Sequence, residues 1–377
     1  MAVQDRIRLT GVLREGPRLR GPFYLGPLSR WVCCAQMTAA ETDERLELRL
    51  MTRDDAPGVV ALARACYGNT HPHERLYHPE LLIEDQDAGV QVNEVAVNPD
   101  GEVISHVAAI FRGPAVVEGC EAMTAERYRG HEVCERLEAQ LAARVKGLGV
   151  KWIMSEPSLL HTVSQEVVVR GGGAITGFRL KCIRPVTAAG FIEEIEDGGR
   201  QSLATAFDPL GQLKSRDIWA ASDYAELVAL ALGQADWPRT LRTEAPADLQ
   251  LPPQTRLRSS FDEPQANMRI EVEVIGEDIT EAVRAERDAA QAAGALSIEL
   301  RIPTSDPAAV AVALLDEGFS YAAFLPELRE HSDVLLLQWL ADPQIDTDVW
   351  QLLNPQIETL AHAIVAQAKL AAERKVS

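Results

Sequence analysis

The alternation of strand-like and helix-like segments in the first half of the chain is the feature that most limits what this protein can fold into. Residues 46–50 alternate polar and apolar side chains as a strand does, and residues 90–111 form two further strands around a hairpin turn. Residues 55–66 and 132–146 instead repeat their apolar positions with the spacing of amphipathic helices. Continued to residue 183, the order is strand, two helices, three strands, helix, strand, helix, strand. This order predicts an α/β protein (α+β mixed sheet) with helices on both faces.

A similar alternation returns between residues 268 and 325. The predicted elements are a strand at 268–275, a helix at 278–293, a strand at 295–302, a helix at 305–317, and strands at 318–325 and 333–340. The repetition predicts tandem domains, because 377 residues exceed the size at which one hydrophobic core usually stops growing. The predicted parts are a flexible basic arm at 1–45, a first domain at 46–185, a second domain at 186–342 and a C-terminal helical part at 343–377.

Two segments of the second half carry less definite predictions. Residues 238–253 contain several prolines and are expected to form an interior loop. Residues 355–373 have one apolar stripe and are expected to form a helix. This helix packs either on the body of the protein or on a second subunit.

The charge and composition exclude several classes of protein. The chain carries 37 basic and 56 acidic residues, and its formal net charge of −19 does not suit a general nucleic-acid binder. No apolar run approaches the roughly 18 residues of a membrane span. The first 36 residues lack the apolar core of a signal peptide, so we expect a cytoplasmic protein. These residues are a loose arm, a basic targeting segment, or sequence upstream of a true start at Met37.

The spacing of cysteines and histidines gives no sign of a metal centre. The six cysteines are too few for a disulfide framework, and none has the spacing of a zinc site. They are Cys33, Cys34, Cys66, Cys120, Cys134 and Cys182. His71, His73 and His78 lie in a proline-rich loop, where metal binding is one interpretation and contact with a substrate is another. We therefore predict no metal cofactor.

One short motif carries most of the functional argument. Arg127-Tyr-Arg-Gly-His-Glu132 lies between an apolar strand, at about 115–123, and the helix at 132–146. A loop that enters a helix N-terminus exposes N–H groups to an anion, and Arg127 and Arg129 can add charge-assisted hydrogen bonds. The motif and the order of elements resemble those of the GNAT acetyltransferase superfamily, which binds the pyrophosphate of acetyl-CoA with Gln/Arg-x-x-Gly-x-Gly/Ala. An ordinary strand-to-helix turn with surface arginines is the alternative.

Glu132 departs from this motif, because the family has Gly or Ala at its position. A carboxylate within about 4 Å of a phosphate costs roughly 4 kcal/mol at an effective dielectric constant near 20. The side chain also crowds the approach of a ligand to the backbone. Alternatively, Glu132 turns outward and stabilises the helix N-terminus, with His131 partly neutralising it. The two interpretations predict a site that has lost acyl-CoA binding and one that retains it.

A second group of residues extends the resemblance. Glu156, His161 and the pair Ser164-Gln165 match the spacing of one GNAT branch. Gly318-Phe319, Pro326-Glu327 and Leu337-Gln338 resemble the degenerate second acetyltransferase-like domain of that branch. The equivalent turn of this second domain, Gly276–Ile279, has two acids and no arginine, so we do not expect it to hold CoA. The resemblance covers about residues 46–340.

The resemblance implies an N-acyltransferase that moves an acyl group from acetyl-CoA, or another acyl-CoA, to a small amine by direct attack in a ternary complex. The residues that it assigns to the cofactor are Met123 (through a backbone N–H), Arg127, Arg129, Gly130, His131 and Glu132. The catalytic candidates are Glu121 and Glu156 as bases acting through water, and His161 and Ser164 as groups near the leaving thiolate. Each has a structural alternative, as a solvated carboxylate, a core histidine or a helix cap.

A function of a different class stays open. The chain is alternatively a non-catalytic GNAT-fold binding or assembly module whose CoA site has decayed. Glu132 is the residue that separates the two hypotheses. For either one we expect no nucleic-acid or membrane partner, and a homodimer is one option.

Overall fold

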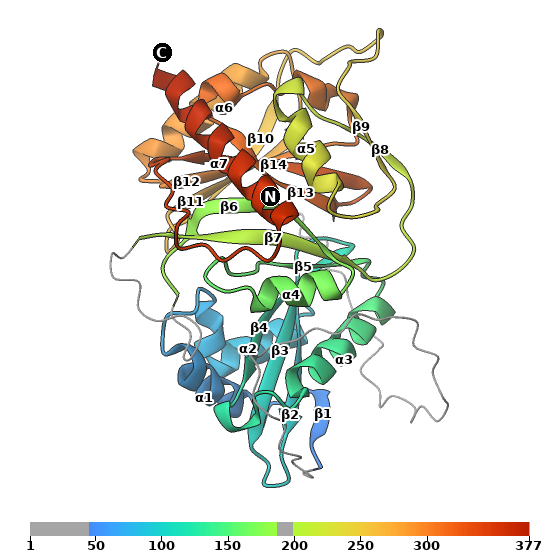
Figure 1. Cartoon of the computed structure of the whole chain (residues 1–377), viewed down its shortest axis with the longest axis vertical. Helices are drawn as coiled ribbons and strands as arrows, with labels where there is room; N and C mark the ends of the chain where they lie inside the picture. The colour runs from blue at the N-terminus through green and yellow to red at the C-terminus, as the bar shows by residue number, and fades with distance from the viewer. Residues whose placement is uncertain (1–44, 187–198, 377) are drawn as a thin grey trace.

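The computed structural model of this protein describes residues 45–186 and 199–376. Within these ranges, twelve strands form one continuous sheet, and two more strands form a small second sheet (Figure 1). The predicted basic arm, with Cys33, Cys34 and Met37, lies outside the described residues up to residue 44. The mixed sheet with its helices confirms the predicted fold class.

The elements have the following bounds. In sheet order, the strands are β1 (Glu47–Leu50), β2 (Gln91–Val97), β3 (Val103–Phe111), β4 (Val116–Thr124), β5 (Trp152–Ser155), β7 (Gln201–Pro209), β6 (Ala174–Ile183), β13 (Ser320–Arg329), β14 (Ser332–Leu340), β12 (Ser297–Pro303), β11 (Asn267–Val274) and β10 (Arg256–Asp262). The small sheet consists of β8 (Arg216–Trp219) and β9 (Arg239–Arg242). The α-helices are α1 (Ala56–Tyr67), α2 (Pro79–Asp87), α3 (Val133–Gly147), α4 (Val163–Arg170), α5 (Ala225–Leu232), α6 (Ile279–Ala292) and α7 (Pro355–Val376). The 3-10 turns are η1 (Glu74–Tyr77), η2 (Glu126–Tyr128), η3 (Ser222–Tyr224), η4 (Pro307–Ala311) and η5 (Leu315–Glu317).

Helices cover both faces of the first half of the sheet. α1 and α2 pack on one face, where their apolar side chains meet Val95 and Met123. α3 packs on the other face, against Val92, Ile104 and Val117. Successive side chains of a strand point to opposite faces, so β2 supplies Val92 to one layer and Val95 to the other.

The same run of strand pairings occurs twice in the large sheet. The strands β3-β4-β5-β7-β6 pair in the senses antiparallel, parallel, antiparallel and antiparallel, and β10-β11-β12-β14-β13 pair in the same four senses. α3 connects the parallel pair of the first run, and α6 connects that of the second. The division of the chain at residue 186 stays a prediction; β7, which follows that residue, pairs with β5 and β6.

The two runs join where β6 meets β13, and Gly177 lies at this joint. Gly177 is registered with Ala323 in an antiparallel pair. A Cβ atom on Gly177 would lie 1.9 Å from the backbone oxygen of Ala322 and 2.4 Å from the Cα of Ala323. The two backbones therefore approach this closely only because residue 177 has no side chain. Phe178 and Phe324 belong to one buried cluster, so the apolar core continues across the joint.

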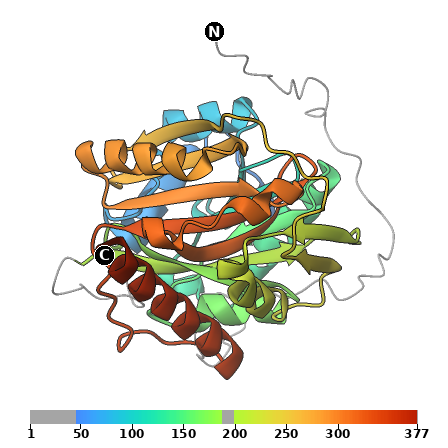
Figure 2. The same cartoon turned by 90° about the horizontal axis from the view of Figure 1, so that it is seen from above.

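The C-terminal helix packs on the body of the protein. Ile357, Leu360 and Ile364 of α7 are buried in the main cluster. The side chain of Gln367 accepts a hydrogen bond of 2.7 Å from the backbone N–H of Tyr321 on β13. Figure 2 shows α6 and α7 on opposite sides of the second-half strands. Neither α7 nor any other helix of the described ranges is long and apolar enough to cross a membrane.

Parts of the second half differ from the sequence prediction, which also had no counterpart of β7, β8 and α5. The predicted helix at 305–317 is the pair of 3-10 turns η4 and η5; Pro307 opens it, and the β-branched Val310 and Val312 disfavour its continuation as an α-helix. The predicted loop at 238–253 contains β9, which pairs with β8. β10 was not predicted, because most of its side chains are exposed and the strand lacks an apolar face.

Gly177→Ala tests the joint between β6 and β13. The added methyl group has to displace the backbone of Ala322, so we expect a loss of about 1–3 kcal/mol in the free energy of unfolding, the usual range for overpacking. Urea unfolding of the full chain measures this loss. Gly147→Ala is the control, because a Cβ at the exposed end of α3 meets nothing within 4 Å. Equal stability of Gly177→Ala and the parent protein would contradict this account of the joint.

Candidate functional site

A cavity of about 350 Å³ opens where β4 and β5 stop pairing. The two parallel strands pair only over residues 116–118 and 152–154. Beyond this point, residues 119–124 form one wall of the cavity and residues 155–158 form another. Side chains of α3, of α4 and of the segment before η1 line the other sides. A pocket at the diverging carboxyl ends of parallel strands is a common place for a ligand.

Glu121 lies in the β4 wall, at a break in the regular strand. The pairing of β3 with β4 jumps from Ala108 and Cys120 to His106 and Met123, which leaves one extra residue on β4. Glu121 takes up this β-bulge with a φ angle of 56°, a left-handed value that residues other than glycine seldom adopt. Its side chain is buried. The bulge therefore fixes a buried carboxylate at the edge of the cavity, and Met123 lines the same wall.

Polar side chains hold the carboxylate of Glu121. Its Oε1 lies 3.0 Å from Nδ1 of His73, and its Oε2 accepts a hydrogen bond of 3.0 Å from Gln91. Gln91 also donates to Asn93, whose Oδ1 lies 3.1 Å from Nε2 of His106. Burial raises the pKa of Glu121, but the hydrogen bond and charge of His73 outweigh it, and the pKa is lowered overall. Glu121 is thus an anion with both oxygens engaged, which weakens the prediction that it acts as a base.

Glu156 lies in the wall formed by the end of β5 and shares an arginine with Glu299 of β12. Arg179, on β6, forms ion pairs with both carboxylates, which ties the cavity wall to the second half of the chain. Burial raises the pKa of Glu156, and despite Arg179 the charges of Glu118 and Glu299 keep it above the ordinary glutamate value. A carboxylate with a raised pKa in a cavity wall suits a general base.

His161, Ser164 and Gln165 lie beside this wall, and the structure gives them different roles. His161 and Ser164 line the cavity. Burial lowers the pKa of His161, which favours the neutral imidazole. Ser164 Oγ accepts a hydrogen bond of 3.2 Å from the backbone N–H of Ser158. The fully buried Gln165 donates to the carbonyls of Ser158 and Gln351, so it fixes the loop.

The predicted phosphate-binding turn separates its two arginines. Arg129 lines the cavity, and its Nε donates to the carbonyl of Thr124 at 3.1 Å. Arg127 is exposed; it pairs with Glu102, and its guanidinium lies 4.9 Å from the centre of the Tyr128 ring. The structure therefore keeps one of the two predicted cations at the cavity and places the other in solvent.

Glu132 adopts a left-handed conformation at the start of α3. Its φ angle is 56°, that of Gly130 is 80°, and the side chain of Glu132 is exposed and makes no capping hydrogen bond. Nδ1 of His131 lies 3.0 Å from the carbonyl oxygen of Arg129. Glu132 thus faces outward, and its remaining cost is a backbone conformation that suits glycine better, by roughly 1 kcal/mol.

Of the three histidines in the proline-rich loop, two reach the cavity. His71 and His73 line it, and their rings meet edge to face with centres 5.0 Å apart. His78 is not among the lining residues and lies 3.5 Å from the carboxylate of Glu80. The interpretation of all three histidines as one cluster is therefore wrong, because His78 opens α2 and points elsewhere.

Arg179 and Glu138 belong to this region and were outside the sequence prediction, and only Glu138 carried a signal. Arg179 lies on the same face of β6 as Lys181, opposite the buried Phe178 and Leu180, so the strand pattern gives no sign of its role. Glu138 falls on the apolar stripe of α3, between Cys134 and Leu141, and lines the cavity. A charge on the apolar stripe of a helix is the sign that would have found Glu138; Arg179 has no such sign.

The corresponding turn of the second half is closed. A Cβ atom on Gly276 would lie 2.4 Å from the backbone of Gln254, and the N–H of Gly276 donates to Thr255. Asp278 accepts a hydrogen bond of 2.6 Å from the N–H of Thr255 at the start of α6. The chain's own backbone therefore occupies the space in front of this helix.

No family model and no curated protein matches the sequence, whereas solved structures do. One is a chimera of spermidine N-acetyltransferase SpeG from Vibrio cholerae and hSSAT, 16% identical, which covers 44% of this chain and 95% of its own, with a TM-score of 0.34. Another is the GNAT family N-acetyltransferase YhbS from Escherichia coli in complex with CoA, 18% identical, at 46% and 86% coverage and a TM-score of 0.30. A third is a ribosomal-protein-S5-alanine acetyltransferase from Vibrio fischeri, 15% identical, at 47% and 100% coverage and a TM-score of 0.36. All three are acetyltransferases by name, and the second is described as a GNAT family member; at such identities and TM-scores they say nothing of this chain's activity.

Glu138 gives the cavity a measurable pH dependence. Burial, with a smaller effect of Glu135, raises the pKa of Glu138 to about 8, and its Oε2 has no hydrogen-bond partner among the described residues. The folded state thus holds this proton more tightly than the unfolded state does, so the contribution of Glu138 to stability falls as the pH rises from about 4.5 to about 8. Glu138→Gln carries no such proton. We expect its melting temperature to match that of the parent protein near pH 4.5 and to exceed it increasingly towards pH 8.

Melting curves across this pH range test the expectation for Glu138. Glu135→Gln, one turn earlier on α3, is the control and should show little of the trend. A difference between Glu138→Gln and the parent that stays constant with pH would contradict a neutral carboxyl group in the cavity wall.

Proposed function

We propose that the protein is an N-acyltransferase that transfers the acyl group of acetyl-CoA, or of another acyl-CoA, to a small amine. The observation that carries the proposal is the cavity between β4 and β5, which extends from Arg129, near the start of α3, to Glu156 at the end of β5. Arg129, which comes shortly before the N-terminus of α3, and a carboxylate with a raised pKa thus border the same space. The acyl-CoA and the amine that accepts the acyl group can both bind in this cavity.

The start of α3 fits a diphosphate in three respects. The helix has 15 residues, so its N-terminal N–H groups and dipole favour an anion. Glu132 is exposed and places no capping oxygen over these groups. Arg129 supplies a cation at the cavity wall. The retained-site interpretation of Glu132 is therefore the one that we adopt.

Glu156 is the residue that we assign as the base. An amine must lose a proton as it attacks a thioester carbonyl, and a carboxylate whose pKa lies above the usual value accepts that proton more readily. Glu118, Glu121 and Glu156 all line the cavity and favour a cationic amine over a neutral acceptor. His161 and Ser164 remain candidates for the group that faces the leaving thiolate. Alignment of two bound substrates supplies the rest of the acceleration.

Thermal melting with acetyl-CoA tests the cofactor site. A ligand at 100 times its dissociation constant adds about 2.7 kcal/mol to the free energy of unfolding. We expect acetyl-CoA to raise the melting temperature, and Glu132→Gly to bind it more tightly and to relieve the left-handed backbone. Glu132→Gln is the matched variant, because it removes the charge and keeps the Cβ atom. No shift at millimolar acetyl-CoA in the parent or in Glu132→Gly would favour the non-catalytic module.

Glu156→Gln tests the assigned base. We expect the turnover rate at saturating substrates to fall by about 10²–10⁴-fold, the usual contribution of a general base, with the shift by acetyl-CoA unchanged. In the parent protein, the rate should decline as the pH falls through the pKa of Glu156, above the ordinary value of 4.5, because protonation removes the base. The variant should lack this decline. Glu80→Gln, exposed on α2, is the control, and a pH profile shared by Glu156→Gln and the parent would overturn the assignment.

A further inference from the structure

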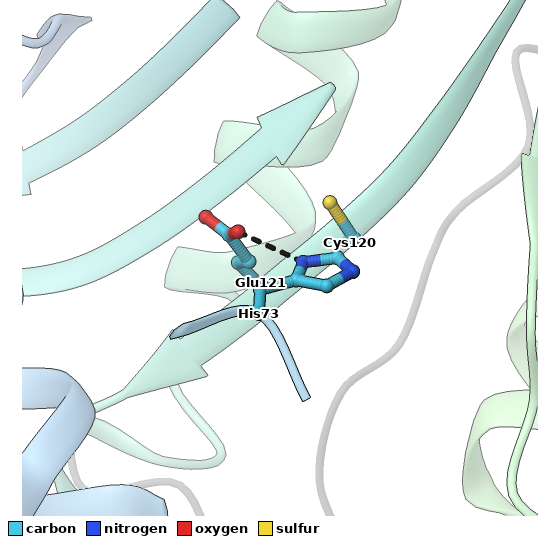
Figure 3. A group of neighbouring side chains, drawn as sticks. All are labelled: His73, Cys120 and Glu121. Atoms are coloured by element: carbon cyan, nitrogen blue, oxygen red, sulfur yellow. Dashed lines mark hydrogen bonds and ion pairs between the residues drawn. The ribbon is translucent and has the colours of Figure 1, made fainter. Parts of the chain in front are cut away.

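Three side chains at the cavity carry donor atoms of the kinds that zinc binds. One ligand atom each of His73, Cys120 and Glu121 can be chosen so that all three lie within 4.8 Å of one another. Figure 3 shows the sulfur of Cys120 and the carboxylate of Glu121 beside the His73 ring. All three residues line the cavity, so an ion bound here would be reached from it.

The bulge on β4 explains why these side chains meet. Neighbouring side chains of a regular strand point to opposite faces, which would keep Cys120 and Glu121 apart. The left-handed conformation of Glu121 breaks this alternation, and the pairing with β3 skips a residue at the same place. His73 arrives from the loop before η1 and places its Nδ1 against Glu121. The sequence shows none of this, because His73 lies 48 positions from Glu121.

The surroundings of the cluster resemble those that orient metal ligands. In a tetrahedral site with bonds of about 2.0–2.2 Å, nitrogen and oxygen ligands lie about 3.3 Å apart; Nδ1 of His73 and Oε1 of Glu121 are 3.0 Å apart. The second oxygen of Glu121 is held by Gln91. Nε2 of His73 faces Oε1 of Glu118 at 3.9 Å, and metal-bound histidines commonly present their other N–H to a carboxylate.

The donor set selects the class of metal. Thiolate, imidazole and carboxylate together suit Zn²⁺ or Co²⁺, whereas Mg²⁺ and Ca²⁺ prefer oxygen ligands only. Sulfur and nitrogen ligands of a filled site lie about 3.6 Å apart, so binding draws the sulfur inward from the 4.8 Å limit. Glu118 and Glu121 add negative charge that favours a divalent cation, partly offset by Arg112.

We propose that His73, Cys120 and Glu121 form a binding site for one Zn²⁺-like transition-metal ion, with the fourth coordination position open to the cavity. The thiol proton of Cys120 is released to solvent on binding. Three protein ligands with one open position are the pattern of a metal that also holds water or a bound ligand. The proposal stands on these contacts alone and does not depend on acyl transfer.

Titration of the metal-free full-length chain with Co²⁺ tests the proposal. All samples carry Cys33→Ser and Cys34→Ser, so that a sulfur-to-cobalt absorption band reports the described cysteines. We expect one equivalent of Co²⁺ to produce this band together with tetrahedral ligand-field bands, and one equivalent of Zn²⁺ to abolish them. Absence of the sulfur band at saturating Co²⁺ would show that His73 and Glu121 are only a hydrogen-bonded pair.

Variants locate the ion. Cys120→Ser should lose the sulfur band, and His73→Gln should weaken Co²⁺ binding by at least tenfold. Cys182→Ser, which changes a buried cysteine outside the cavity lining, should leave both unchanged. A band that survives Cys120→Ser overturns the assignment. If Cys120→Ser fails to fold, alkylation of the parent protein decides: Zn²⁺ should slow modification of Cys120 selectively, and an unchanged rate refutes the site.

Discussion

The short pairing between β4 and β5 is the constraint on which the candidate site depends. The two strands share three registered pairs and then separate, so the sheet opens without being interrupted elsewhere. For the sheet to open here, β4 has to separate from β5 while it stays paired with β3 on its other side. The bulge at Glu121 gives β4 this freedom, because it changes the local twist while β3 continues to pair beyond it. The cavity, the buried carboxylate and the cluster around His73 all follow from that one departure.

Four glutamates border this cavity, and the structure balances their charges in three ways. Glu118 pairs with Arg112, Glu121 contacts His73 and Glu156 pairs with Arg179, whereas Glu138 keeps its proton at neutral pH. An unpaired charge in such a place would be costly, and each arrangement removes this penalty. The pKa of Glu121 is lowered and that of Glu156 is raised, although both carboxylates line the same cavity. Glu121 is therefore suited to remain an anion, and Glu156 is suited to accept a proton.

The elements of the first half could be predicted from the sequence because their signals are local. The helical period of residues 132–146 and the turn at Asn98–Gly101 lie within short windows, and α3 and the β2–β3 hairpin appear where those windows place them. The left-handed conformation of Glu132 was not predicted, because the motif has Gly or Ala at this position and alanine does not require such a conformation.

The features that the sequence did not predict depend on contacts between residues far apart in the chain. The bulge at Glu121 has no signature in sequence, because it arises from the register of β3 against β4. The same holds for Arg179, whose two partners lie on different halves of the chain. The turns at 305–317 replaced a predicted helix, since burial of small apolar side chains there was compatible with either form. Local sequence pattern thus predicted the helices and strands of the first half, whereas contacts across the sheet determined the surroundings of Glu121 and Arg179.

The pairing of β6 with β13 also protects an edge of the first half of the sheet. A strand at the border of a sheet presents unsatisfied N–H and C=O groups, which invite other chains to add to it. In a protein ending after β7, β6 would be such a border. Here β13 of the same polypeptide pairs with β6 and covers this edge. The closed turn at Gly276 does not affect this pairing. The second half therefore protects the edge of β6 from pairing with other chains, whether or not it binds a ligand.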